Sequence, residues 1–210
     1  MKKLFFVLPI ASVMLVSCGE STANDALDGA LTESGDIDAA VVSFADGGAT
    51  DGEQYFSGVL AEVVEVDVKL REVKELDEMD ATEEEIKTVL DDAIQMIKDA
   101  RTAMDLYSDK SWPKRSELHD ITLEWFAVVE ALMNDYLYDL AEPMSRPDDT
   151  WTDEEIAFYE QYSEAYEGFY EVDERWVNFQ HEYAAANGFE LSGTIDEESM
   201  VNEEVSNMSH

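Results

Sequence analysis

Few residues in this chain of 210 are of the types that carry out covalent or metal chemistry. There is one cysteine, Cys18, and there are three histidines. The chain also has 50 aspartates and glutamates. A di-metal carboxylate centre in a helical protein needs Glu-x-x-His pairs on two helices. Ser116 lies three residues before His119, and Asn178 lies three residues before His181, so neither histidine fits that pattern. We therefore expect no metal site.

Motifs that mark catalytic nucleophiles and nucleotide sites are absent from the sequence. It has no Gly-x-Ser-x-Gly elbow, no phosphate-binding loop and no dinucleotide fingerprint. A single cysteine cannot complete a Cys-x-x-Cys-His haem attachment site. We therefore expect neither a cofactor nor enzymatic activity. An enzyme is kept as the third of three hypotheses, which a buried acidic pair on facing helices with perturbed titration would favour.

The cysteine closes an N-terminal targeting segment. Two lysines follow Met1, and residues 4–16 are an almost unbroken apolar run, shorter than the roughly 20 residues that span a bilayer. The sequence Leu15-Val16-Ser17-Cys18 then resembles the lipobox of bacterial lipoproteins. This resemblance implies that residues 1–17 are a cleaved signal peptide and that a diacylglycerol is attached to the Cys18 thiol. The alternative is an ordinary secretory peptide in which Cys18 is incidental.

The residues after the cysteine bear on localisation. Gly19 is not the Asp that resembles an inner-membrane retention signal in enteric bacteria, so the resemblance implies the outer membrane. Glu20 partly matches a short acidic motif that directs lipoproteins of some bacterial groups to the cell surface. We expect an outer-membrane lipoprotein that either faces the periplasm or is exposed at the cell surface.

Charge limits the possible partners. The formal net charge is −37, with 50 acidic and 13 basic residues. Nucleic-acid binding needs clustered Lys and Arg, and electrostatic adhesion to anionic lipid needs the same, so we expect neither. The lipid anchor is therefore the predicted contact with the membrane. Residues 18–53 hold nine acidic side chains and no basic one, and their Gly, Ala, Ser and Thr content predicts a flexible acidic tether after the lipidated cysteine.

From Gln54 onward, apolar residues recur at alternating spacings of four and three, which places them on one face of a helix. The predicted helices begin near residues 54, 82, 113 and 152, the second and fourth at Thr-x-x-Glu capping boxes. The third should end near Glu142, because Pro143 and Pro147 cannot continue it. The predicted inward residues of this third helix are Leu118, Ile121, Trp125, Val128, Leu132, Tyr136 and Leu140.

Four long amphipathic helices joined by short linkers predict an all-α fold, an antiparallel up-down-up-down four-helix bundle over residues 54–191. A parallel coiled-coil oligomer is the alternative, and the helix-breaking linkers argue against it. Residues 192–210 are acidic and turn-prone and are expected to form a C-terminal tail.

Aromatic residues gather toward the C-terminal end, where half of the 22 lie between Trp151 and Phe189. Tyr159, Tyr166 and Tyr170 form a stripe beside the predicted core face of the fourth helix. The simplest interpretation is that this stripe widens the buried face while its phenol groups reach water. The functional interpretation is a ligand groove that also includes Trp176, since pockets for small molecules are lined mainly by apolar and aromatic side chains.

The end of the fourth predicted helix, Trp176-Val-Asn-Phe-Gln-His-Glu-Tyr-Ala-Ala-Ala-Asn-Gly-Phe189, resembles the ending of a known family. This is the family of helical surface lipoproteins named from a Leptospira surface protein and common in Bacteroidota. Its members combine a lipobox with a four-helix body and end in a Gln-x-x-aromatic-Ala segment. The similarity covers about residues 54–191, and it implies an envelope location without an established activity, cofactor or catalytic residue.

Two hypotheses therefore lead. The first is a lipid-anchored, non-enzymatic envelope or surface protein that binds another envelope or extracellular component. The alternative is a helical bundle that binds a small molecule, a sugar or an apolar ligand, in the aromatic groove of the fourth helix. The sequence does not identify the partner in either case.

Overall fold

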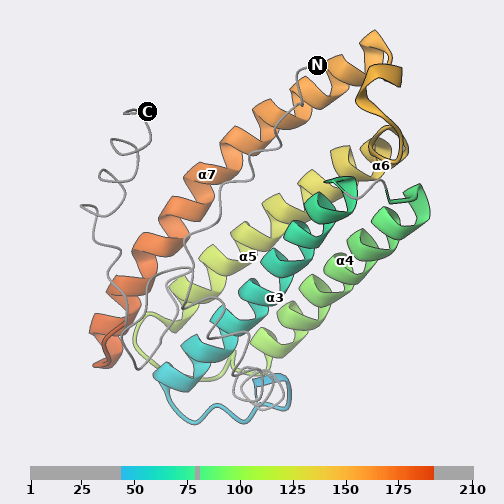
Figure 1. Cartoon of the computed structure of the whole chain (residues 1–210). Coiled ribbons are helices and arrows are strands. Elements are labelled where there is room, and N and C mark those ends of the chain that lie inside the picture. The colour runs from blue at the N-terminus through green and yellow to red at the C-terminus, as the bar shows by residue number, and fades with distance from the viewer. Residues whose placement is uncertain (1–43, 79–80, 192–210) are drawn as a thin grey trace, which may run out of the picture.

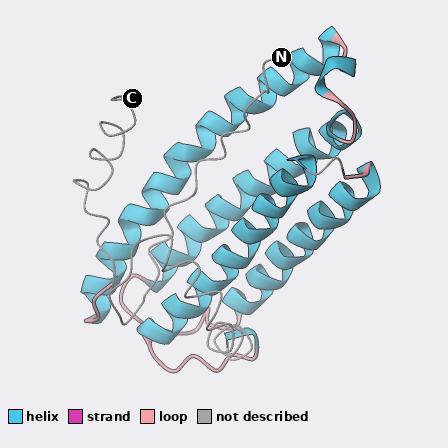
Figure 2. Cartoon of the chain, viewed as in Figure 1, coloured by secondary structure: helices cyan, strands magenta, loops and turns pink. Residues whose placement is uncertain are grey.

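The computed structural model describes residues 44–78 and 81–191. In chain order the elements are α3 (Gly52–Glu78), α4 (Glu83–Asp105), α5 (Arg115–Leu132), the π-helical η1 (Met133–Leu137), α6 (Tyr138–Met144), the 3-10 helix η2 (Asp148–Thr150) and α7 (Asp153–Asn187). Over these residues the chain contains helices and loops and no strand (Figure 2). The all-α prediction is thus confirmed. The predicted signal peptide, Cys18, the predicted tether up to residue 43 and the predicted tail 192–210 lie outside the described residues.

Because α5, η1 and α6 follow one another without a break, they form one long helical stretch. This stretch lies side by side with α3, α4 and α7 (Figure 1). The most extensive contacts join α3 with α4 and α5 with α7, and α6 packs on α4. The backbones of α3 and α7 approach each other closely at only a few places. Large side chains such as Phe56, Leu90 and Trp125 are fully buried between the helices. Burial of each such side chain contributes about 1.5–3 kcal/mol to the free energy of unfolding.

Both capping boxes form where the sequence predicts them. The Thr82 hydroxyl accepts a hydrogen bond from the Glu85 N–H at 3.3 Å, and the Glu85 carboxylate accepts one from the Thr82 N–H at 2.8 Å. Thr152 and Glu155 make the same reciprocal pair at the start of α7. At the other end of α7, Gly188 adopts φ 79°, a left-handed conformation that glycine takes without a steric penalty.

The third helical stretch differs from the prediction in its phase and in its end. The π-helical turn of η1 contains an extra residue, which rotates the following residues around the helix axis. As a result Leu137 is buried, whereas Tyr136, predicted to point inward, is only half-buried. Ile121 and Val128 are also half-buried, at the edge of the core.

The predicted stop at Glu142 is wrong by two residues, because α6 continues through Pro143 to Met144. A proline in a last helical turn lacks only one backbone N–H, and the ring of Pro143 is buried. Its location therefore lets the helix add apolar surface to the core before it ends.

The ordered body begins before the predicted helix start at Gln54. Phe44 is 1% exposed, and its ring stacks on Tyr107 with the ring centroids 5.1 Å apart. The Tyr107 hydroxyl donates a hydrogen bond to the Phe44 carbonyl at 2.8 Å and accepts one from the Ala49 N–H at 3.1 Å. Phe44 and Ala49, which the composition assigned to the flexible tether, are therefore packed on the helices.

No helix among residues 44–78 and 81–191 is long and apolar enough to cross a membrane.

Candidate functional site

The four aromatic residues singled out in the sequence lie along α7 but differ in exposure. Tyr170 is 38% exposed, Tyr159 and Tyr166 are half-buried, and Trp176 is 1% exposed. The Trp176 indole N–H donates a hydrogen bond to the Thr122 hydroxyl at 3.0 Å inside the core. Trp176 thus packs between α7 and α5, and the structure does not bring it together with the tyrosines on an open surface.

The tyrosines form a continuous row of ring contacts. Tyr162 lies between Tyr159 and Tyr166, with centroid distances of 6.0 and 5.9 Å, and Tyr166 meets Tyr170 edge-on at 5.5 Å. Such tilted and edge-on pairs contribute about 0.5–1.5 kcal/mol each beyond the area they bury. The row therefore stabilises the side of α7 that faces α3.

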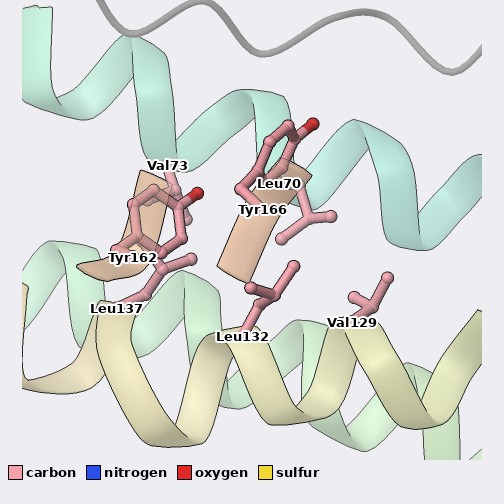
Figure 3. A pocket seen from close by; sticks show the side chains of 7 residues that line it. All are labelled: Leu70, Val73, Val129, Leu132, Leu137, Tyr162 and Tyr166. Atoms are coloured by element: carbon pink, nitrogen blue, oxygen red, sulfur yellow. The ribbon is translucent and has the colours of Figure 1, made fainter. Parts of the chain in front are cut away.

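One hollow lies against this row, between α3, α5, η1 and α7. Its walls are mostly apolar, and they are formed by Leu70, Val73, Val129, Leu132, Leu137, Tyr162 and Tyr166. Figure 3 shows the two tyrosine rings of α7 between the leucine and valine side chains of the neighbouring helices. The cavity volume is about 10 Å³, enough for about one water molecule. Of the four predicted residues only Tyr166 reaches this hollow.

One helical turn along α3 from the hollow, polar side chains from three helices meet. Asp67 of α3 is 8% exposed and accepts a charge-assisted hydrogen bond from the Arg71 guanidinium. Asp173 of α7 is half-buried and accepts a hydrogen bond from the Trp125 indole N–H of α5 at 3.0 Å. We use the name α3–α7 polar cluster for Asp67, Arg71, Trp125, Tyr166 and Asp173.

Burial raises the pKa of both carboxyl groups in the cluster. For Asp67 burial outweighs the opposing effect of the Arg71 charge. For Asp173 burial acts first, the bond from Trp125 opposes it, and the negative charge of Asp67 raises the pKa further. Burial also raises the pKa of Tyr166, and Tyr170, Asp67 and Asp173 add to that effect. The charge of Asp67 on α3 thus contributes to the raised pKa of Asp173 on α7.

The neighbouring hollow has space for about one water molecule and not for a sugar. The hollow beside these carboxyl groups is therefore too small for a sugar or another ligand of that size.

Neither Asp67 nor Asp173 stands out in the sequence. Each lies among many other acidic residues, and their proximity depends on how α3 and α7 face each other. The only sequence signal is that both occupy positions adjacent to the predicted apolar face, beside Val66 and Val172.

Another buried acidic side chain lies on α3 away from this cluster. Glu62 is 5% exposed, and its pKa is raised to about 7, first by burial and then by the charges of Glu65 and of Asp99 on α4. In the part of the chain that the structure describes, no group of three or more His, Cys, Asp or Glu side chains is placed to hold a metal ion.

Comparisons of the chain with protein-family models, with curated proteins and with solved structures find no match.

Proposed function

We propose that this protein is a lipid-anchored, non-enzymatic envelope protein of the outer membrane, whose helical body binds another envelope or extracellular component. The observation that carries this proposal is the sequence Leu15-Val16-Ser17-Cys18 directly after a charged and then apolar N-terminal segment. Two or three acyl chains, at about 0.8 kcal/mol per buried methylene, would hold the protein stably at a membrane. The resemblance to helical surface lipoproteins supports the same location.

In this proposal the body is an antiparallel up-down-up-down four-helix bundle. Short connections support the antiparallel order, since α3 and α4 are separated by four residues and α6 and α7 by eight. The extensive contacts of α3 with α4 and of α5 with α7 are those of neighbours in such a bundle.

In this proposal, the position of Phe44 suggests which end of the bundle would lie toward the anchor. Phe44 packs on Tyr107 at the end of α4, and the Tyr183 hydroxyl near the end of α7 donates a hydrogen bond to the Gly52 carbonyl at 3.1 Å. The N-terminal segment therefore meets the bundle at the end where α3 begins and α7 finishes. That end would face the membrane, and the opposite end, where α6 leads into α7, would be presented away from it.

Surface charge restricts the partner that this body would bind. Basic side chains such as Lys69, Arg101 and Arg175 are engaged in ion pairs with carboxylates. The exposed face of α7, in contrast, carries glutamates at positions 160, 164, 167, 171 and 174. A partner that is neutral or basic on its contacting face is favoured, because like charges repel across an interface.

The anchor is tested by fractionating cells that produce the full chain, its Cys18→Ala variant and a Ser17→Ala control. Cys18→Ala should move the protein from the membrane to the soluble fraction, whereas Ser17→Ala keeps a small residue before the cysteine and should stay in the membrane fraction. Incorporation of labelled fatty acid should follow the same pattern. A Cys18→Ala chain that remains in the membrane fraction would refute the anchor.

Protease treatment of intact cells, with and without permeabilisation of the outer membrane, separates a surface location from a periplasmic one. Crosslinking in intact envelopes then tests for the partner, with Cys18→Ala as the matched control that has lost its location. A protein that is crosslinked to the anchored chain and not to the released one supports the proposal. Repeated recovery of no partner would count against it.

A further inference from the structure

The segment that leads into α3 is tied to the end of α4 by one side chain. The Tyr107 hydroxyl donates a hydrogen bond to the Phe44 carbonyl at 2.8 Å and accepts one from the Ala49 N–H at 3.1 Å. Tyr107 is fully buried, whereas residues 45–48, between the two bonded positions, are exposed. In Figure 1 this segment runs from beside the end of α4 to the start of α3. A single buried hydroxyl group thus closes the segment into a loop.

The ring of Phe44 is held by side chains of two helices. It stacks on Tyr107 at a centroid distance of 5.1 Å and lies against Tyr55 of α3 at 5.7 Å. Gly58 of α3 is the residue that admits the ring, because a Cβ at this position would come within 2.3 Å of it. The ring therefore occupies a close-fitting site formed by Tyr55, Gly58 and Tyr107, which we call the Phe44 seat.

The same segment is fixed at a second point, where α3 begins. The Gly52 carbonyl accepts a hydrogen bond from the Tyr183 hydroxyl of α7 at 3.1 Å. A Cβ on Gly52 would lie 2.2 Å from the side-chain oxygen of Asn187, so the backbone is packed tightly against α7 as well. The chain that enters the body is thus bound to α3, α4 and α7.

The first turn of α3, in contrast, is capped by exposed side chains. The Asp51 carboxylate accepts a hydrogen bond from the Gln54 N–H at 2.9 Å, and the Gln54 side-chain oxygen accepts one from the Thr50 N–H at 3.0 Å. Exposed helix ends open locally with little free energy, whereas buried contacts open far less often. A pull that reached this turn directly would therefore unwind it, but a pull on the chain N-terminal to Phe44 meets the Phe44 seat first.

We propose that the Phe44 seat and the two Tyr107 hydrogen bonds form a clasp, which transfers tension on the N-terminal segment to the bundle and protects the first turn of α3. Such a clasp suits a body that is held at a membrane through one end of its chain. That role rests on the proposed lipid anchor, whereas the clasp itself is measured on the chain in solution. A failure of the anchor in the Cys18→Ala fractionation is therefore distinguishable from a failure of the clasp.

Optical tweezers test the proposal by pulling the full chain between Cys18 and a cysteine that replaces Glu164, an exposed residue of α7. In the wild-type chain, residues 44–51 should be released in the same step in which the body unfolds. When the clasp is weakened, their release should appear as an earlier step at lower force. This step should lengthen the chain by up to about 29 Å, the extended length of the released residues.

Two variants weaken the clasp in different ways. Tyr107→Phe keeps the stacked ring and removes both hydrogen bonds, and Gly58→Ala crowds the ring of Phe44. Each should produce the earlier step. Gly168→Ala is the matched control, because its new Cβ meets no atom within 4 Å, and it should unfold in one step like the wild type.

Chymotrypsin cleavage of the bond between Phe44 and Ala45 is an independent measure, because the enzyme must first take the ring out of its seat. This bond should be cleaved about 100-fold more slowly in the full chain than in a peptide of residues 38–50. Tyr107→Phe should lose about tenfold of this protection, as expected for two hydrogen bonds. Release of residues 44–51 well before the wild-type body unfolds, or wild-type behaviour of both variants in either assay, would overturn the proposal.

Discussion

Replacement of Glu62 by glutamine should stabilise the folded chain at neutral and alkaline pH. Glu62 is 5% exposed on α3, and burial, Glu65 and Asp99 raise its pKa from 4.5 to about 7. Since the pKa is higher in the folded state than in the unfolded state, the folded chain binds this proton more tightly. The free energy of unfolding therefore rises as the pH falls from above 7 toward 4.5, and the ionised Glu62 destabilises the fold above pH 7.

The magnitude follows from this displacement of the pKa. A change from 4.5 to about 7 corresponds to about 3 kcal/mol at pH values above 7. Partial access of water to the carboxylate reduces this, and we expect Glu62→Gln to raise the free energy of unfolding by about 1–2 kcal/mol at pH 8. At about pH 3.5, where Glu62 is almost fully protonated in both the folded and the unfolded state, the variant and the wild type should differ little.

Urea unfolding at several pH values measures the effect as the difference between variant and wild type, which removes the contribution of the many other carboxyl groups. Glu75→Gln, on the exposed side of the same helix, is the matched control and should shift the free energy of unfolding by less than about 0.5 kcal/mol. A Glu62→Gln chain whose stability has the same pH dependence as the wild type would refute the reasoning.

Three further substitutions test other parts of the fold by urea or thermal unfolding. Gly58→Ala would place a Cβ 2.3 Å from the ring of Phe44 and should lower the free energy of unfolding by about 1–3 kcal/mol. In Gly168→Ala the new Cβ meets no atom within 4 Å, and the free energy of unfolding should rise by about 0.5–1 kcal/mol. Equal effects of the two substitutions would contradict this packing. Thr152→Ala removes the N-cap of α7 and should lower the free energy of unfolding by about 1 kcal/mol. Thr152→Ser keeps the hydroxyl group and should retain most of the stability that the cap provides. Equal losses in the two variants would argue against the cap. Arg71→Met leaves the Asp67 carboxylate without its cation and should cost about 3 kcal/mol at neutral pH, most of which the added Asp67→Asn change should restore. No recovery in the double variant would show that Arg71 acts through packing alone.

Features that depend on local sequence were predictable. The Thr82 and Thr152 capping boxes, the glycine at the end of α7 and the length of that helix follow from a few neighbouring residues, because caps and breakers act within one turn. The apolar face of α4 from Ile86 to Met104 is buried as its spacing indicates. These elements need no information about which helix packs on which.

Features that depend on tertiary contacts were not predictable. A π-helical turn gives no pattern in the apolar spacing, so the phase shift after Met133 becomes visible only through the burial of Leu137 in place of Tyr136. Phe44 lies in a stretch whose composition is that of a linker, yet Gly58 leaves room for its ring against α3. In such cases one large apolar side chain outweighs the composition of its surroundings.

The aromatic content of α7 has a physical explanation in the spacing of the helices. Because the backbones of α3 and α7 approach closely at few places, short aliphatic side chains could not fill the space between them. Tyr162 and Tyr166 are long enough to reach Leu70 and Val73, and a phenol group at the tip tolerates the neighbouring water and carboxylates better than an aliphatic chain. The same spacing leaves room for Asp67 and Asp173 at the edge of the tyrosine row. A row of tyrosines flanked by two acidic side chains is thus the packing expected of an interface that is closed by side chains alone.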